Sequence, residues 1–278
     1  MTDRPTIVIG RATPILRRVP AGLAELAAYR ELLGYMTVNR LRVRYQSSWL
    51  GWAWALLQPL ALLGFLSVVG LAIGARTTSG VAYPLFILAS LSPWTFFATS
   101  LSTSAAGVLN SRSLIAKVYF PREIVPFSCV FAALADLAIA AALTIVALLC
   151  AGHNIPATAI ELLPISLILI IYAAAFSLLI SIAQIGFRDI AIGLPLLLQG
   201  LMLMTPVLYP LDAVPERWRL VYSLNPLALL VEAFRGALMD KHTISLGQLV
   251  YAAVAGLILF GIAYFVFKTA EPDMVDEI

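Results

Sequence analysis

Few residues of this chain have the types and spacing that catalysis or metal binding would need. There is no GxxxxGK[ST] loop, the motif whose backbone and lysine hold ATP phosphates. His153 and His242 are the only histidines, and no cysteine or acidic cluster stands beside them at a metal-ligand spacing. The paired aspartates typical of membrane prenyltransferases are also absent. We therefore expect neither an enzyme nor a metal site.

Asp136 is the one acidic residue inside a long apolar stretch. A carboxylate within a membrane is costly, and it usually faces the protein interior and finds a partner. Asp136 is then either a proton or cation site, or a hydrogen-bonded residue that bridges helices. We favour the bridging role, because the sequence shows neither a second acidic residue nor a basic partner for it.

The composition indicates a membrane protein. Soluble domains are about 45–50% apolar and about 25% charged, whereas this chain of 278 residues is 61% hydrophobic and 12% charged, with a formal net charge of +3. These values exclude a secreted disulfide scaffold, a disordered chain and a soluble nucleic-acid binder. Cys129 and Cys150 fall in one expected helix, about 31 Å apart along its axis, too far for a disulfide. We expect both to be small buried residues.

Six charge-poor stretches are long enough to cross a membrane, which takes about 20 apolar residues. We therefore predict an all-α polytopic membrane protein with six transmembrane helices, at about 50–74, 82–107, 124–150, 162–186, 190–209 and 246–267. With the N-terminus inside, the cytoplasmic segments hold 13 of the 18 Lys and Arg, as the positive-inside rule favours. Both termini are expected to be cytoplasmic. No apolar core of a cleaved signal peptide precedes the first span.

Two stretches outside the spans have a helical pattern. In residues 20–45, Leu26, Tyr29, Leu33 and Met36 share one helical face, and Ala28, Glu31 and Tyr35 lie opposite. This predicts an amphipathic helix in the headgroup plane, or alternatively a solvated helix with no further role. In residues 210–241, the apolar run LVYSLNPLALLV is interrupted by Asn225-Pro226. We expect two short helices that bend there and dip into the outer leaflet, with Glu232 and Arg235 able to pair.

The loop from Asn110 to Pro126 reads NSRSLIAKVYFPREIVP. It is short and basic, and it carries more apolar residues than a plain cytoplasmic loop needs. An exposed Leu-Ile-Ala-Lys-Val-Tyr-Phe run would fit a groove of a soluble partner. We therefore expect a docking loop.

This loop resembles the coupling segment of ABC-2 permeases, within the group that exports polysaccharides and polyol phosphates. Five further segments are similar to that group and follow its order over roughly 235 residues: RYQSSWLGWAWALLQPL (Arg44–Leu60), FRDI (Phe187–Ile190), TPVLYP (Thr205–Pro210), NPLALLVEAFRGAL (Asn225–Leu238) and the acidic tail FKTAEPDMVDEI (Phe267–Ile278).

The resemblance implies a half-transporter in the bacterial inner membrane. It would be a single ABC-2 domain over 1–278, with a cytoplasmic interface segment (1–45), a membrane domain (46–268) and a cytoplasmic tail (269–278). A homodimer of the chain would pair with two copies of a separate ATPase, which would carry the ATP and Mg, so this chain would need no cofactor. The expected cargo is a lipid-linked glycan such as O antigen. Capsule, teichoic acid, or a small lipid or drug are alternatives, and a glycolipid-assembly enzyme would lack its catalytic residues here.

The resemblance also assigns roles to residues, all of them expectations. The substrate path would be lined by Trp52, Gln58, Phe65, Gln199, Met202 and Tyr209. Trp52 and Tyr209 are alternatively interfacial anchors. The ATPase-coupling residues would be Arg112, Leu114, Lys117, Tyr119, Phe120, Arg122 and Glu123. The cytoplasmic mouth, where arginines would attract a lipid pyrophosphate, would consist of Arg40, Arg42, Arg44, Leu50 and Gly51. The outer gate would hold Asp212, Glu216, Trp218, Asn225, Glu232 and Arg235.

Overall fold

A computed structural model of the chain describes residues 25–46, 49–72, 81–115, 117, 120–187, 189–240 and 244–271. Within these ranges the chain forms helices joined by turns, and no strand occurs. The helices are α2 (Arg30–Gln46), α3 (Trp54–Ala72), α4 (Tyr83–Asn110), α5 (Arg112–Ile115), α6 (Ile124–Cys150), α7 (Leu162–Gly186), α8 (Ile190–Met204), α9 (Glu216–Leu224), α10 (Pro226–Leu238) and α11 (Leu246–Ala270).

Five helices of the described chain are long and apolar enough to cross a membrane, namely α3, α4, α6, α7 and α11. The bounds of α6 and α7 match the prediction, and α4 and α11 each run three residues further than predicted. The expected span at 190–209 is shorter, because α8 ends at Met204. Thr205 precedes Pro206 and adopts an extended conformation, as residues before proline prefer.

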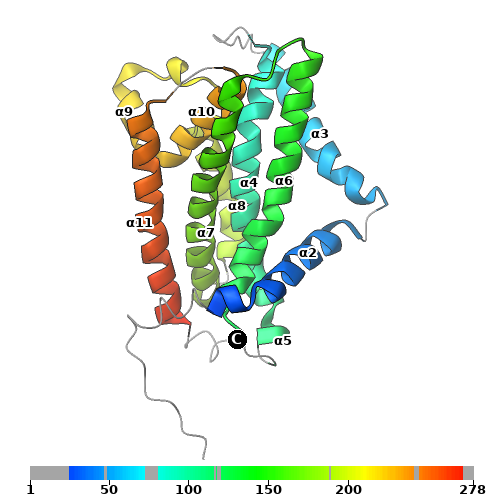
Figure 1. Ribbon diagram of the computed structural model, residues 1–278, viewed down its shortest axis with the longest axis vertical. Coiled ribbons are helices and arrows are strands. Elements are labelled where there is room, and N and C mark those ends of the chain that lie inside the picture. The colour runs from blue at the N-terminus through cyan, green and yellow to red at the C-terminus, as the bar shows by residue number, and fades with distance from the viewer. Residues whose placement is uncertain are drawn as a thin grey trace, which may run out of the picture.

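The spanning helices form a bundle around α4, which packs against α6, α7, α10, α8 and α3 (Figure 1). One end of the bundle carries α5, the start of α6 and the end of α11, and we call it the α5 end. The opposite end carries α9 and is called the α9 end. Helix α3 splays away from the bundle toward the α5 end, and α2 crosses the bundle there (Figure 1).

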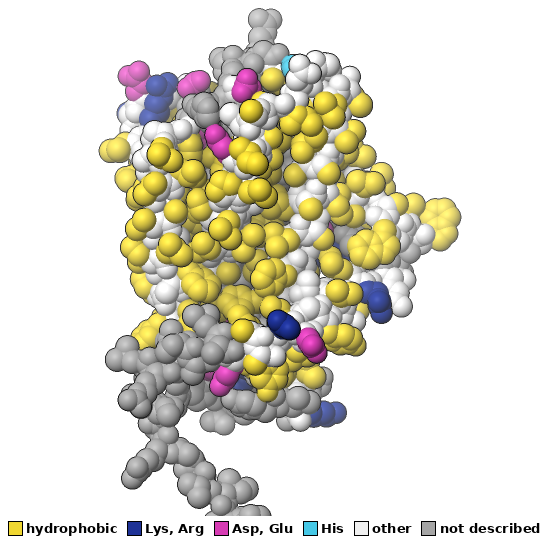
Figure 2. Space-filling model, viewed as in Figure 1, with side chains coloured by type: hydrophobic (Ala, Val, Ile, Leu, Met, Phe, Trp, Pro, Cys, Tyr) yellow, Lys and Arg dark blue, Asp and Glu magenta, His cyan; other side chains and the backbone are white. Residues whose placement is uncertain are grey.

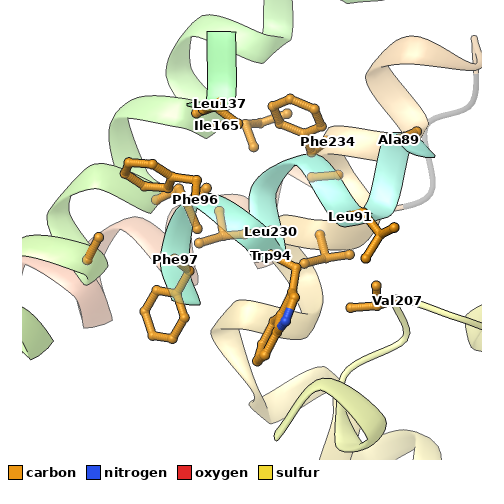
Figure 3. Close-up of a cluster of buried hydrophobic side chains, with 14 of the residues drawn as sticks. Ala89, Leu91, Trp94, Phe96, Phe97, Leu137, Ile165, Val207, Leu230 and Phe234 are labelled. Carbon is orange, nitrogen blue, oxygen red and sulfur yellow. The ribbon is translucent and has the colours of Figure 1, made fainter. Parts of the chain in front are cut away.

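The core of the bundle lies between α4, α6, α7 and α10. Figure 3 shows Trp94, Phe96 and Phe97 of α4 close to Leu230 and Phe234 of α10. Small and hydroxyl residues let α4 and α7 approach closely, a common device in membrane bundles. Ser177 and Ser181 donate to the carbonyl oxygens of Ser100 and Ser104, at 3.4 and 3.3 Å.

The outer surface matches a membrane environment. Figure 2 shows apolar side chains over the middle of the bundle and charged side chains mostly near its two ends. Exposed large apolar residues are numerous on α3, α8 and α11. Such a surface would be unusual in water, and lipid is its natural neighbour.

Helix α2 and the residues just before it (25–29) show the two predicted faces. Leu26, Tyr29, Leu33 and Met36 are partly buried, and they pack against a cluster of Val108, Phe120, Ile124 and Val125. Ala28, Glu31 and Tyr35 are exposed. The apolar face of α2 is therefore covered by the α5 end of the protein itself.

The cysteines are both free, one buried and one exposed. Cys129 is buried as predicted, but the prediction is wrong for Cys150. Cys150 is the last residue of α6, and its side chain is exposed there.

Candidate functional site

The predicted docking loop has a short helical turn, α5, and only part of it is exposed. Leu114 and Lys117 are exposed and Arg112 is partly buried. Tyr119 lies outside the described residues. Phe120 is buried at 4% exposure among Val108, Ile124 and Val125. The predicted exposed apolar run therefore does not include Phe120, whose ring instead fixes the loop to the bundle and supports α2.

Glu123 also points inward, although it was expected among the residues that contact a partner. Its carboxylate is fully buried, lies 2.8 Å from Lys268 Nζ, and accepts a hydrogen bond from the Tyr264 hydroxyl at 3.0 Å. Lys268 also pairs with Glu271 at 3.0 Å, and Arg122 donates to the Glu271 carbonyl oxygen. The start of α6 is thus tied to the end of α11.

Two of the three predicted mouth arginines bind α6. Arg40 Nε donates to Ser128 Oγ at 2.7 Å, and Arg44 lies 2.6 Å from the Asp136 carboxylate. Arg42 is exposed. Asp136 therefore has the basic partner that the sequence did not reveal, and it bridges α6 to α2 as we favoured.

The turn that follows α2 leads into α3. Leu50 is exposed, and Gly51 has a positive φ of 51°, a conformation that glycine adopts without strain. A 3-10 turn, Gly51–Ala53, then begins the span. Leu50 and Gly51 thus lie directly before the first span, and their role at a cytoplasmic mouth stays a prediction.

The six predicted path residues do not gather at one place. Trp52 of the 3-10 turn, Phe65 of α3 and Gln199 of α8 are exposed. Met202 of α8 is partly buried and packs against the core. Gln58 lines a pocket with Thr95 and Thr99 of α4 and Asp136 of α6. The two predicted walls, α3 and α8, each pack on α4.

Tyr209 lies near the α9 end. Its hydroxyl is 2.7 Å from that of Tyr222, and it also bonds the Leu203 carbonyl oxygen at 2.7 Å. The two rings are tilted at 67° with centroids 6.4 Å apart.

The predicted gate region folds into two short helices that meet at Asn225-Pro226, as expected. Asn225 Oδ1 caps α10 by accepting from the backbone amides of Leu227 and Ala228, at 3.1 and 3.4 Å. Asp212, Glu216 and Trp218 lie around α9, and all three are exposed. Eleven consecutive residues of α10, 228–238, are buried.

The Glu232–Arg235 pair is confirmed, and it is buried inside the bundle. The Arg235 guanidinium lies 4.1 Å from the Phe86 ring centroid and donates to Ser90 Oγ and the Pro206 carbonyl oxygen, both at 3.0 Å. Arg235 therefore links α10 to α4 and to the segment that follows α8. Burial lowers the pKa of Arg235 and Glu232 opposes that shift.

The sequence that forms most of these helices matches a known family. The family model described as ABC-2 type transporter matches residues 31–239, which run from α2 to the end of α10. The chain belongs to the ABC-2 type transporter family.

Several relatives are similar to this ABC-2 chain over most of their length. The O-antigen export system permease protein RfbA of Myxococcus xanthus is 26% identical over 258 residues, which cover 91% of this chain and 98% of that protein. RfbA of Klebsiella pneumoniae is 28% identical, with 84% and 87% covered. The polysialic acid transport protein KpsM of Escherichia coli is 28% identical, with 86% and 93% covered.

Several contacts of this ABC-2 chain were not predicted from its sequence. Glu123 contacts Lys268 and Tyr264. Asp136 shares a pocket with Thr95 and Thr99. Arg235 donates a hydrogen bond to Ser90. The sequence does place Glu123 and Lys268 at the same depth in the membrane, because each directly flanks a predicted span on its cytoplasmic side. Depth alone does not say which helices are neighbours.

Proposed function

We propose that this chain is the transmembrane subunit of an ATP-driven exporter that moves a polysaccharide, such as a lipid-linked O antigen, out of the cytoplasm. The observation that carries the proposal is the near full-length similarity to permeases of O-antigen export and polysialic acid transport. The aligned region covers 98% of the length of the Myxococcus xanthus protein, and this supports a shared half-transporter architecture.

We further propose that α8 and the residues after it form a sixth span. Fifteen helical residues reach about 22 Å, short of the ~30 Å hydrocarbon core. The non-helical residues 205–210, which form turns and bends, would add the missing length. Non-helical backbone at membrane depth needs internal hydrogen-bond partners. Arg235 donates a hydrogen bond to the Pro206 carbonyl oxygen, and the Tyr83 hydroxyl donates one to the Leu208 carbonyl oxygen at 3.0 Å. These internal partners support the proposal.

In the proposed orientation the α5 end and both termini face the cytoplasm. The distribution of Lys and Arg favours this side. Helices α9 and α10 would then be the re-entrant gate helices of the outer face, and the chain would lie in the inner membrane.

The energy would come from a separate ABC ATPase that holds the ATP and Mg. Two copies of this chain would form a homodimer and bind two ATPase subunits. Leu114, Lys117 and the partly buried Arg112 would contact that partner, and the exposure of Leu114 and Lys117 supports this proposal. Trp52, Phe65 and Gln199 are exposed on one protomer, as residues that line a path between two copies would be.

The test deletes the gene for this chain in the bacterium that carries it and measures the polysaccharide on the cell surface. The wild-type chain should restore surface glycan, and a Leu114→Asp/Lys117→Glu variant should lose both export and co-purification with the ATPase. Glu31→Lys on the exposed face of α2 is the matched control and should behave as wild type. Unchanged surface glycan after removal of the chain would refute polysaccharide export, and it would favour a small lipid or drug as cargo.

A further inference from the structure

Polar side chains from three helices converge on one pocket near the middle of the bundle. The pocket has a volume of about 160 Å³ and is lined by Gln58 of α3, Thr95 and Thr99 of α4, and Asp136 of α6. The rest of its lining is aliphatic and includes Pro59 and Leu62. We call it the midplane pocket, because Thr95, Thr99 and Asp136 lie near the centres of their long helices.

A polar pocket at this depth requires a polar occupant. The hydrocarbon core has no water to serve exposed polar groups, so ionisable residues there face a cavity or a partner. The side chains of Arg44 and Asp136 keep 28% and 21% of their surface exposed. A charged pair that faced lipid acyl chains would be costly, and the pair is therefore better placed beside water or a polar ligand.

The charges of the site point to a neutral ligand. Arg44 lies 2.6 Å from Asp136, so the pair has no net charge. A cation site would need uncompensated carboxylates, and a phosphate site would need uncompensated cations. The midplane pocket has an excess of neither negative nor positive charge. It therefore favours a ligand that carries many hydrogen-bonding groups and no charge.

The available donors and acceptors suit hydroxyl groups. Thr95 Oγ1 donates to the Leu91 carbonyl oxygen at 2.8 Å, which leaves its own oxygen able to accept. Thr99 lies one helical turn further on the same face of α4. The Gln58 amide can both donate and accept, and the Asp136 carboxylate can accept. Aliphatic walls beside these groups match the C–H faces of a sugar ring.

We propose that the midplane pocket binds one sugar unit of the transported glycan through its hydroxyl groups. The proposal rests on polysaccharide export as the function, and it adds Thr95, Thr99 and Asp136 to the residues that contact the cargo. The hydrogen bonds are few, so the binding is weak. A polymer that must move on needs contacts weak enough to release it, as conduction through any pore does.

The first test measures whether water reaches the pocket. Thr99→Cys is placed in a Cys129→Ala/Cys150→Ala background and labelled with 2-aminoethyl methanethiosulfonate in membranes that contain the ATPase complex. Phe131→Cys, at an exposed apolar position of α6, is the control for a lipid-facing thiol. We expect labelling of the thiol at position 99 and little at position 131. An unlabelled Thr99→Cys would overturn the pocket as a polar site.

The same variant tests the ligand. Labelling should be slower in membranes from cells that make the glycan than in membranes from cells that cannot make it. Equal rates, or protection by sodium or inorganic phosphate instead, would overturn the assignment to a sugar.

A second test removes single hydroxyl groups. Thr99→Val keeps the size of the side chain and should lower glycan export by about three- to tenfold, the effect of one lost hydrogen bond. Thr103→Val is the matched control, because Thr103 lies one turn away and donates within α4, at 2.7 Å to the Thr99 carbonyl oxygen. Normal export by both variants would refute the site and leave the function standing. Failure of the wild-type chain to export glycan would refute the function itself.

Discussion

At the scale of single residues, charge pairs decide where α2 and α6 meet. Arg44 and Asp136 pair at the edge of the midplane pocket, so each stabilises the charge of the other. Removing one partner leaves an uncompensated charge at low dielectric, whereas removing both leaves a neutral site.

We predict that Arg44→Gln and Asp136→Asn each lower the melting temperature of the purified complex, and that the double variant is more stable than the sum of the two losses implies. The coupling energy should be about 1–3 kcal/mol. Arg42→Gln, at an exposed position of the same helix, should have little effect. Additive losses would show that the pair contributes no stability of its own.

The cluster around Glu123 makes a parallel case at the α5 end. The fully buried Glu123 depends on Lys268 and Tyr264 for compensation. Lys268→Met should destabilise the protein by about 3–5 kcal/mol, because it leaves a buried carboxylate unpaired. Adding Glu123→Gln should recover part of that loss in thermal unfolding. Thr269→Ala serves as the control, since the Thr269 hydroxyl bonds the Val266 carbonyl oxygen of its own helix. No recovery in the double variant would contradict this account.

At the scale of helices, α3 is held to the bundle at one end. Adding a Cβ to Gly70 would bring it into collision with the Tyr83 ring at the start of α4. Toward its start, α3 meets α4 and α6 across the midplane pocket, which Ala55 and Gln58 line. Helix α3 is therefore packed tightly at the α9 end and loosely at the α5 end.

We predict that Gly70→Ala destabilises the protein by about 1–3 kcal/mol, because the Tyr83 ring must shift and its hydroxyl must leave the Leu208 carbonyl oxygen. Gly64 lies in the same helix, and a Cβ added there would meet no atom within 4 Å. Gly64→Ala should be neutral or slightly stabilising by helix propensity. Equal thermal stability of the two variants would show that the α3–α4 contact does not require glycine.

Most helices could be predicted from the sequence, but not the way they pair. The bounds of α6 and α7 were predicted from the length of their charge-poor stretches, since a lipid bilayer requires long apolar helices. The break at Asn225-Pro226 predicted α9 and α10, because proline ends a helix and asparagine caps one. The partners of Glu123 and Asp136 could not be predicted, because both lie on helices distant in sequence. The early end of α8 was missed because the turn that begins at Thr205-Pro206 carries no charge to mark it.

At the scale of the whole molecule, the native cysteines report which end of the bundle faces outward. Cys150 is exposed at the last residue of α6, on the α9 side of the bundle, and Cys129 is buried near the α5 side. In the proposed orientation, a membrane-impermeant maleimide should label Cys150 in cells whose outer membrane has been made permeable, and Cys150→Ser should abolish that label. Inverted inner-membrane vesicles should stay unlabelled until detergent opens them. Labelling of Cys150 in inverted vesicles alone would place the α9 end in the cytoplasm. That result would reverse the sides assigned to the docking loop and the gate helices, because both assignments depend on the same orientation.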